Sequence, residues 1–204
     1  MITIYGSAKS SSGRCFWCLE EIGQPYERKA INFREREHKS EAYLEINPNG
    51  KVPALTDGDY IIWESMAINL YLAEKYKPSL LGSSLDVKGK VYQWSIWAIA
   101  ELQAPLIDIF IQMVFVPEEK RDQTKIDDAM KKLPVLLGVL EKSLTNTKYL
   151  AGDEFTLADL NTLSVVSLCE HVKFELNDFP KILGWRKVIS EREAYKRFAK
   201  ILAE

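Results

Sequence analysis

Residues 47–65 read NPNGKVPALTDGDYIIWES, and this stretch decides how the first part of the chain folds. Asn-Pro and Asn-Gly are strong turn signals, and the Val-Pro-Ala-Leu run after them is typical of the start of a strand, where proline is tolerated. A second short strand at residues 60–63 follows the hairpin signal Asp-Gly-Asp, and Glu64 and Ser65 open a helix.

These elements predict a site for a small peptide. We expect a cis peptide bond between Val52 and Pro53, which would kink the chain and turn the backbone N–H and C=O of Val52 outward, where they can pair with an extended peptide. The backbone N–H groups at the helix start near Ser65 attract a carboxylate. A peptide-pairing edge beside such a helix end suits a small peptide with a free carboxylate.

The periodicity of the first 76 residues changes repeatedly between strand and helix patterns. The predicted strands are residues 2–5, 26–31, 54–57 and 60–63, and the predicted helices are residues 14–22, 39–46 and 65–76. The first βαβ crossover implies parallel pairing, and the last two strands form an antiparallel hairpin. The order βαβαββα predicts a thioredoxin-like domain over residues 1–77.

The rest of the chain has no strand periodicity. Residues 78–84 are typical of a linker. Two long helices are predicted over residues 88–115 and 122–144, each interrupted or kinked by a proline, and further helices follow a cap at Thr156. The fold class is therefore α/β plus all-α, with an all-helical domain over residues 86–204.

Composition narrows the class of protein. The chain has 204 residues, of which 47% are apolar and 27% charged, with a net charge of −2. This small net charge gives no electrostatic reason to expect binding to nucleic acid or to an anionic membrane. The first residues form a strand rather than a signal peptide, and no uninterrupted apolar run reaches about 18 residues. Three cysteines and two histidines support neither a disulfide framework nor a metal site, so we expect a cytoplasmic protein.

With these motifs, the chain resembles the glutathione transferases over nearly its whole length. Further matching pieces are LAEKY at residues 72–76, and YLAG at residues 149–152 leading into FTLAD at residues 155–159. The pattern is most similar to the bacterial theta- and phi-like groups, whose members use serine rather than tyrosine near the first helix. The resemblance implies glutathione as co-substrate without a metal, a small apolar electrophile, detoxification, and a cytoplasmic homodimer.

The loop at residues 7–14, SAKSSSGR, contains the candidate catalytic residues. In the family that this chain resembles, a hydroxyl near this helix start donates to the glutathione sulfur and favours the thiolate, since a free thiol with a pKa of about 8.5 is mostly protonated at neutral pH. Arg14 aligns with an arginine that follows the active serine by four residues in theta-like relatives, which points to Ser10. Ser11 and Ser12 are rivals, and all three serines could instead cap the helix.

The resemblance also assigns candidate substrate-binding residues. Ser65 would bind the γ-glutamyl carboxylate through its hydroxyl and N–H, and Glu64 would bind the α-amino group. His38, Lys39 and Lys51 are candidates for the glycine carboxylate, and Val52 would pair with the peptide backbone. The alternatives are a helix cap at Ser65 and solvated charges in the segment around His38.

The same fold supports other functions. A glutathione-dependent thiol reductase would use Cys15 or Cys18, although both cysteines lie on an apolar helical stripe with Leu19 and Ile22 that is typical of a core. An isomerase, a dehalogenase or a non-catalytic interaction module are further alternatives. The resemblance implies an electrophile pocket between the two domains, and residues 97–115 contain its candidate lining, for which we expect broad and mainly apolar specificity.

Overall fold

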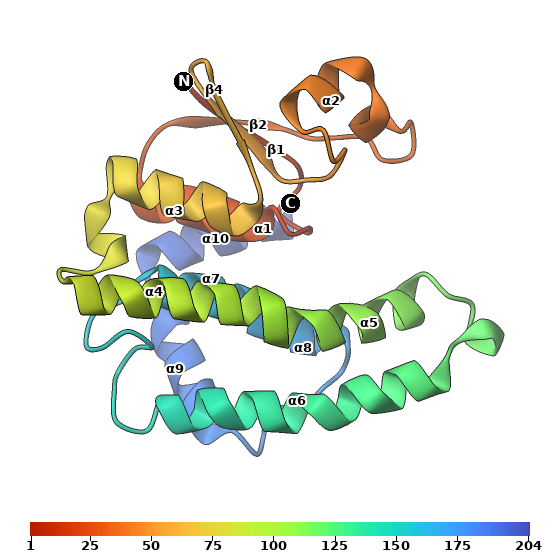
Figure 1. Ribbon diagram of the computed structural model, residues 1–204, viewed down its shortest axis with the longest axis vertical. Coiled ribbons are helices and arrows are strands. Elements are labelled where there is room, and N and C mark those ends of the chain that lie inside the picture. The colour runs from red at the N-terminus through yellow and green to blue at the C-terminus, as the bar shows by residue number, and fades with distance from the viewer. The chain divides into compact units, whose positions relative to one another are not determined.

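The computed structural model describes residues 1–204, which form two compact units: residues 1–81 together with 190–204, and residues 82–189. The first unit contains a mixed sheet in the order β2-β1-β3-β4 (Figure 1). Its strands are β1 (Ile2–Tyr5), β2 (Tyr26–Lys29), β3 (Ala54–Asp57) and β4 (Tyr60–Trp63). β1 pairs with β2 in parallel and with β3 antiparallel, and β3 and β4 form the antiparallel hairpin. The predicted thioredoxin-like order βαβαββα is confirmed.

The helices of the first unit lie on both faces of this sheet. Alternate residues of a strand point to opposite faces. The helices α1 (Gly13–Ile22) and α3 (Ser65–Tyr76) cover one face (Figure 1). Ile4 of β1 is fully buried. The next residue, Tyr5, instead meets Tyr43 of α2 (Glu41–Ile46), with the ring centroids 6.0 Å apart. The short helix α2 therefore packs on the opposite face.

The last helix, α10 (Glu193–Ala203), belongs to the first unit and packs on α1. The ring of Trp17 stacks on Phe198 with the centroids 6.0 Å apart, and Arg192 donates to both carboxylate oxygens of buried Glu21 at 2.9 and 2.7 Å. The sequence predicted one continuous helical domain from residue 86 to the end. In the structure α10 belongs instead to the first unit, which is therefore discontinuous in sequence. The sequence could not predict this, because the amphipathic pattern of α10 does not show which partner covers its apolar face.

The second unit is helical throughout. Its main helices are α4 (Leu85–Trp97), α5 (Gln103–Val114), α6 (Gln123–Ser143), α7 (Leu157–Val166), α8 (Leu168–His171) and α9 (Pro180–Ser190). A π-helical turn, η3 (Ala98–Leu102), separates α4 from α5 just before Pro105, where we expected a kink. By contrast, α6 continues through Pro134 without a break. Leu106, Leu133 and Leu160 are fully buried and belong to the core of this unit.

The helical stretch Leu85–Val114 is long and apolar enough, by length and composition alone, to cross a membrane. This is weak evidence, since the core helix of a soluble protein can meet the same criterion. Leu102, Leu106 and Ile109 of this stretch are fully buried within the protein.

A network around Asp57 joins the end of β3 to α3. The carboxylate of Asp57 accepts hydrogen bonds from Tyr71 (2.9 Å), Lys75 (2.7 Å) and Tyr76 (2.6 Å). Partial burial would raise the pKa of Asp57, but these hydrogen bonds outweigh it and lower the pKa below its usual value. A carboxylate with a lowered folded-state pKa stabilises the fold above the unfolded-state pKa of about 3.9 and loses that contribution as the pH falls.

The variant Asp57→Asn is therefore expected to be less stable than the wild type at pH 7, and the two should converge in acid. Urea unfolding at pH 7 and at several values below about pH 4 would measure this difference. Asp59→Asn, an exposed change in the same hairpin, is the matched control. A stability difference between Asp57→Asn and the wild type that is independent of pH would contradict a role for the charged network.

Candidate functional site

The three serines before α1 lie in different environments. Ser10 is partly buried, and its hydroxyl donates to the backbone C=O of Ser7 at 2.7 Å and lies 3.0 Å from the hydroxyl of Ser12. Ser12 is fully buried. Ser11 is exposed, and its hydroxyl donates to the backbone C=O of Val52 at 3.0 Å. Of the three hydroxyls, only that of Ser11 hydrogen-bonds to the predicted peptide-pairing residue.

None of these serines caps α1 through its side chain. Ser12 stands at the N-cap position with helical dihedral angles, and no backbone N–H of the helix donates to its hydroxyl. Ser12 packs instead against Gly6, where an added Cβ would lie 2.0 Å from the Ser12 hydroxyl oxygen. Gly6 also has a φ of 133°, which favours glycine. The capping alternative therefore has no support in the structure.

Side chains of α2 and of its C-cap hold the backbone segment before Pro53 through hydrogen bonds. The peptide bond between Val52 and Pro53 is cis, as predicted. The backbone C=O of Lys51 accepts hydrogen bonds from the hydroxyl of Tyr43 at 2.7 Å and from the side-chain amide of Asn47 at 2.7 Å. Two buried side chains thus fix the backbone immediately before Val52, while the side chain of Lys51 is exposed.

Glu64 and Ser65 stand at the start of α3. Glu64 occupies the N-cap position with a φ of 73° and ψ of 115°, a costly backbone conformation for a residue with a side chain. Ser65 is buried and is the first residue of the helix rather than its cap. No side chain caps this helix and no acidic residue occupies its first turn, so its backbone N–H groups can serve an anionic ligand.

Arg14 connects the two helix starts. Its guanidinium donates to the Ser65 hydroxyl oxygen at 3.3 Å, and its backbone C=O accepts from the side-chain amide of Asn69 at 3.2 Å. Burial lowers the pKa of Arg14, partly offset by Cys15. The sequence used Arg14 only to align the serines. The contact with Ser65 was not predicted. A cation among the apolar residues of this helix could have indicated that Arg14 needs a polar partner, although not which one.

His38 and Lys39 lie in the short 3-10 helix η1 (Glu37–Lys39). The ammonium of Lys39 donates to the backbone C=O of Asn49 at 3.3 Å, so Lys39 is held against the turn that precedes Lys51. Gly50 permits this approach, because an added Cβ would lie 2.6 Å from the Lys39 nitrogen and 2.7 Å from the His38 C=O. The His38 ring lies against Phe33, and its Nδ1 is buried without a hydrogen bond.

Cys15 and Cys18 are fully buried and form no disulfide. Their thiols contact the backbone C=O groups of Ser65 and Asn69, at 3.5 and 3.9 Å. Burial raises the pKa of Cys15 to about 12 and that of Cys18 well above its usual value. Reactive cysteines are exposed and have lowered pKa values, so both thiols behave as core residues. No group of three or more metal-ligating side chains occurs in the chain.

Several side chains between residues 97 and 115 are accessible. Phe115 is 71% exposed, Ile111 is 42% exposed, and Trp97 is half-buried with its ring edge-on to Trp94. Exposed apolar side chains along a helix are compatible with an apolar ligand, but this compatibility does not identify an individual binding residue. The electrophile site therefore stays a prediction.

Two family models match the chain: glutathione S-transferase, N-terminal domain, over residues 2–74, and glutathione S-transferase, C-terminal domain, over residues 102–193. Glutathione S-transferase 1 of Zea mays is 38% identical over 205 residues, covering 98% of this chain and 96% of that protein. Glutathione S-transferase GstB of Escherichia coli is 31% identical over 205 residues, covering 98% of this chain and 99% of that protein.

Solved structures are similar over nearly the whole chain. A glutathione S-transferase I bound with lactoylglutathione has a TM-score of 0.88 at 37% identity, covering 98% of this chain and 99% of that one. A glutathione transferase of Phanerochaete chrysosporium in complex with oxidized glutathione has a TM-score of 0.91 at 28% identity, covering 99% and 96%. With both domain models matched and full-length relatives above 30% identity, the chain belongs to the glutathione S-transferase family.

Proposed function

We propose that this protein binds glutathione in its first unit and conjugates the glutathione thiolate to small apolar electrophiles. The observation that carries the proposal is the hydrogen bond from Ser11 to Val52, beside the uncapped start of α3 at Glu64 and Ser65. A hydroxyl donor, a peptide-pairing residue and a carboxylate-binding helix end then occur on one unit. These are the three elements that a thiol-activating site for a small acidic peptide requires.

The backbone of glutathione would pair with Val52. The γ-glutamyl carboxylate would accept hydrogen bonds from the hydroxyl and N–H of Ser65, and the α-amino group would donate to the carboxylate of Glu64. Both charges of this end must be compensated when they leave water, which explains the need for a donor and an acceptor side by side. His38, Lys39 and Lys51 are the candidates for the glycine carboxylate at the other end.

The catalytic step depends on where the cysteinyl sulfur lies. In a peptide whose cysteinyl N–H pairs with the C=O of Val52, the cysteine side chain starts one bond from that N–H. The Ser11 hydroxyl, 3.0 Å from the same C=O, is then the serine hydroxyl within reach of the sulfur. Once the cysteinyl N–H occupies the C=O of Val52, the Ser11 hydroxyl can turn its single proton from that C=O to the thiolate, which would stabilise the charged form and lower the thiol pKa. We therefore propose Ser11 as the donor, with Ser10 as the rival that the alignment favoured.

The serine assignment gives a direct prediction. Ser11→Ala should lower kcat/KM by about 10- to 100-fold and raise the pKa of the bound thiol, because a hydrogen bond to a charged group contributes about 1.5–3 kcal/mol. Glutathione affinity should change little. Turnover against an aryl halide and the ultraviolet absorbance of the bound thiolate as a function of pH measure both effects.

Ser10→Ala is the matched control and should reduce turnover less than about threefold, because the Ser10 hydroxyl donates to the backbone C=O of Ser7, an acceptor that bound glutathione is not expected to take over. A larger loss in Ser10→Ala than in Ser11→Ala would return the role to Ser10. Thermal unfolding of both variants separates a catalytic loss from a misfolded loop.

We further propose a cytoplasmic homodimer that serves detoxification, with the electrophile bound by the helical unit. Most soluble oligomers are two-fold symmetric dimers. Exposed apolar side chains such as Ile96 (67% exposed) and Trp63 (38% exposed) provide surface for self-association. Light scattering over a range of concentrations tests the dimer.

A panel of aryl halides and unsaturated carbonyls at saturating glutathione tests the specificity for electrophiles. One substrate that dominates all others would contradict broad specificity.

A further inference from the structure

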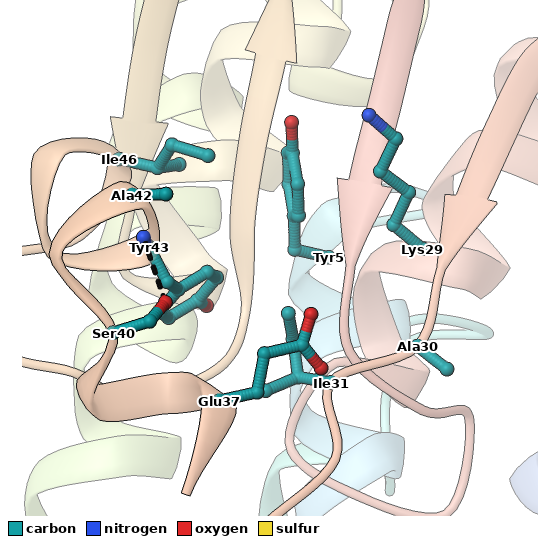
Figure 2. A pocket seen from close by; sticks show the side chains of 9 residues that line it. All are labelled: Tyr5, Lys29, Ala30, Ile31, Glu37, Ser40, Ala42, Tyr43 and Ile46. Carbon is teal, nitrogen blue, oxygen red and sulfur yellow. Dashed lines mark hydrogen bonds between the residues drawn. The ribbon is translucent and has the colours of Figure 1, made fainter.

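Two depressions on the protein surface are lined by residues outside the segment predicted for the electrophile. One lies between β1, β2 and α2 of the first unit (Figure 2), and the other lies beside α9 of the second unit. None of residues 97–115 lines either depression. Within the second unit, an electrophile bound by these residues therefore packs on exposed side chains, and the groups that fix those side chains decide which compounds fit.

The last turn of α5 and its C-cap carry three exposed apolar side chains, Ile111, Val114 and Phe115. The ring of Phe115 is edge-on to that of Phe110, with the centroids 5.9 Å apart. The backbone N–H of Phe115 donates to the C=O of Ile111 at 2.9 Å. The last four C=O groups of a helix have no partner within it, so the positions of these side chains depend on how the helix end is held from outside.

Arg121 holds this end of α5. Its Nε donates to the backbone C=O of Gln112 at 3.0 Å and to that of Val116 at 3.3 Å, and its Nη2 donates to the backbone C=O of Met113 at 3.1 Å. Arg121 is half-buried and forms no ion pair with a carboxylate, so its guanidinium serves these carbonyls alone. The last turn of α5 contains no basic residue of its own. A cation here binds the free carbonyls and offsets the negative end of the helix dipole.

The same turn is also joined to α6. The side-chain oxygen of Gln112 accepts a hydrogen bond from the backbone N–H of Asp122 at 2.9 Å, and Asp122 in turn caps α6 by accepting from the backbone N–H of Lys125 at 3.1 Å. Figure 1 shows α5 and α6 side by side, with this connection at one end of the pair. Arg121 and Asp122 thus fix the end of α5 from two neighbouring positions.

We propose that Arg121 is a positioning residue for the electrophile. It holds the last turn of α5 so that Ile111, Val114 and Phe115 present a fixed apolar surface to the compound. The ammonium of a lysine would not reproduce this hold, because it lacks the planar edge on which Nε and Nη2 donate side by side. The effect of Arg121 on selectivity rests on the proposed function, whereas its hold on α5 does not.

Selectivity between a large and a small electrophile tests this role. Arg121→Gln should lower kcat/KM for the aryl halide 1-chloro-2,4-dinitrobenzene by about fivefold, mainly through a higher KM, because apolar contacts discriminate by modest factors. The value for iodomethane, which is too small to cover this surface, and the KM for glutathione should change less than twofold. Lys120→Gln, an exposed change in the neighbouring turn η4 (Glu118–Lys120), is the matched control. An unchanged ratio of the two kcat/KM values in Arg121→Gln would overturn the positioning role.

A double variant tests whether Arg121 acts through the end of α5. Phe115→Ala should also lower kcat/KM for the aryl halide. Adding Arg121→Gln to Phe115→Ala should then cause a smaller further loss than Arg121→Gln causes alone, because residues that act through one another are not additive. Fully additive losses would show that Arg121 acts by another route.

Hydrogen–deuterium exchange tests the hold on α5 without any substrate. The backbone N–H of Phe115 should exchange at least about tenfold faster in Arg121→Gln than in the wild type, because the helix end opens more often. Unchanged exchange would overturn the hold. If Arg121→Gln does not fold, Arg121→Lys is measured by the same criteria. If the wild type conjugates neither electrophile, the proposed function fails, while exchange still decides whether Arg121 holds α5.

Discussion

Replacing Asp159 by asparagine is expected to lower the free energy of unfolding by about 2–3 kcal/mol, the largest stability effect that we predict for a single residue. Asp159 is fully buried in the second unit. Its carboxylate accepts hydrogen bonds from the backbone N–H groups of Leu150 (2.9 Å) and Thr156 (3.0 Å) and from the indole N–H of Trp185 (2.9 Å). Oδ1 accepts from Leu150 and Trp185 and Oδ2 from Thr156, so an asparagine that keeps its oxygen at the Oδ1 position would direct its NH2 group at the backbone N–H of Thr156, which would then be buried without an acceptor.

Urea unfolding followed by circular dichroism measures this effect as a lower midpoint. Asp153→Asn removes an exposed carboxylate from the same loop and is the matched control, expected to change stability by less than about 0.5 kcal/mol. A loss of less than about 1 kcal/mol in Asp159→Asn would show that the donors around this side chain all keep acceptors in the variant, contrary to the fixed geometry that we describe.

The hydrogen bonds of Asp159 show which contacts can be predicted from the sequence and which cannot. The cap at Thr156 was predicted from the sequence alone, and the structure contains both reciprocal hydrogen bonds of a capping box between Thr156 and Asp159. The contact with Trp185 was not predicted, because the two residues lie on different helices and no local pattern brings them together. Short-range rules thus identified the helix start, while the long-range partner depends on how the helices of this unit pack.

The candidate site likewise contains features that local sequence patterns predict and contacts that they do not. Turn signals and strand periodicity predicted the order of elements, the cis bond before Pro53 and the helix start at Ser65. These patterns could not decide between Ser10 and Ser11. Neighbouring side chains in a tight loop point in different directions, and sequence spacing does not reveal which side chain points toward Val52. That choice rests on the hydrogen bond of Ser11 to Val52, a contact across 41 residues of sequence.

The glutathione anchor gives the second large expected effect. The double variant Glu64→Ala with Ser65→Ala should weaken glutathione binding by about 2 kcal/mol or more, roughly 30-fold, because it removes charge-assisted hydrogen bonds to both charges of the γ-glutamyl end. Isothermal titration of glutathione measures the loss. An unchanged affinity in the double variant would move the anchor to another part of the chain.

Ser65 also accepts a hydrogen bond from buried Arg14, so its removal can perturb folding as well as binding. Glu64→Gln avoids this difficulty, because Glu64 is exposed and glutamine keeps its size at the same positive φ. Titration of this variant with glutathione and with its analogue that lacks the α-amino group isolates the ammonium contact. If Glu64 binds the ammonium, Glu64→Gln weakens binding of glutathione but leaves binding of the analogue unchanged. An equal loss for both ligands would mean that Glu64 only shapes the start of α3, and that the ammonium is bound elsewhere.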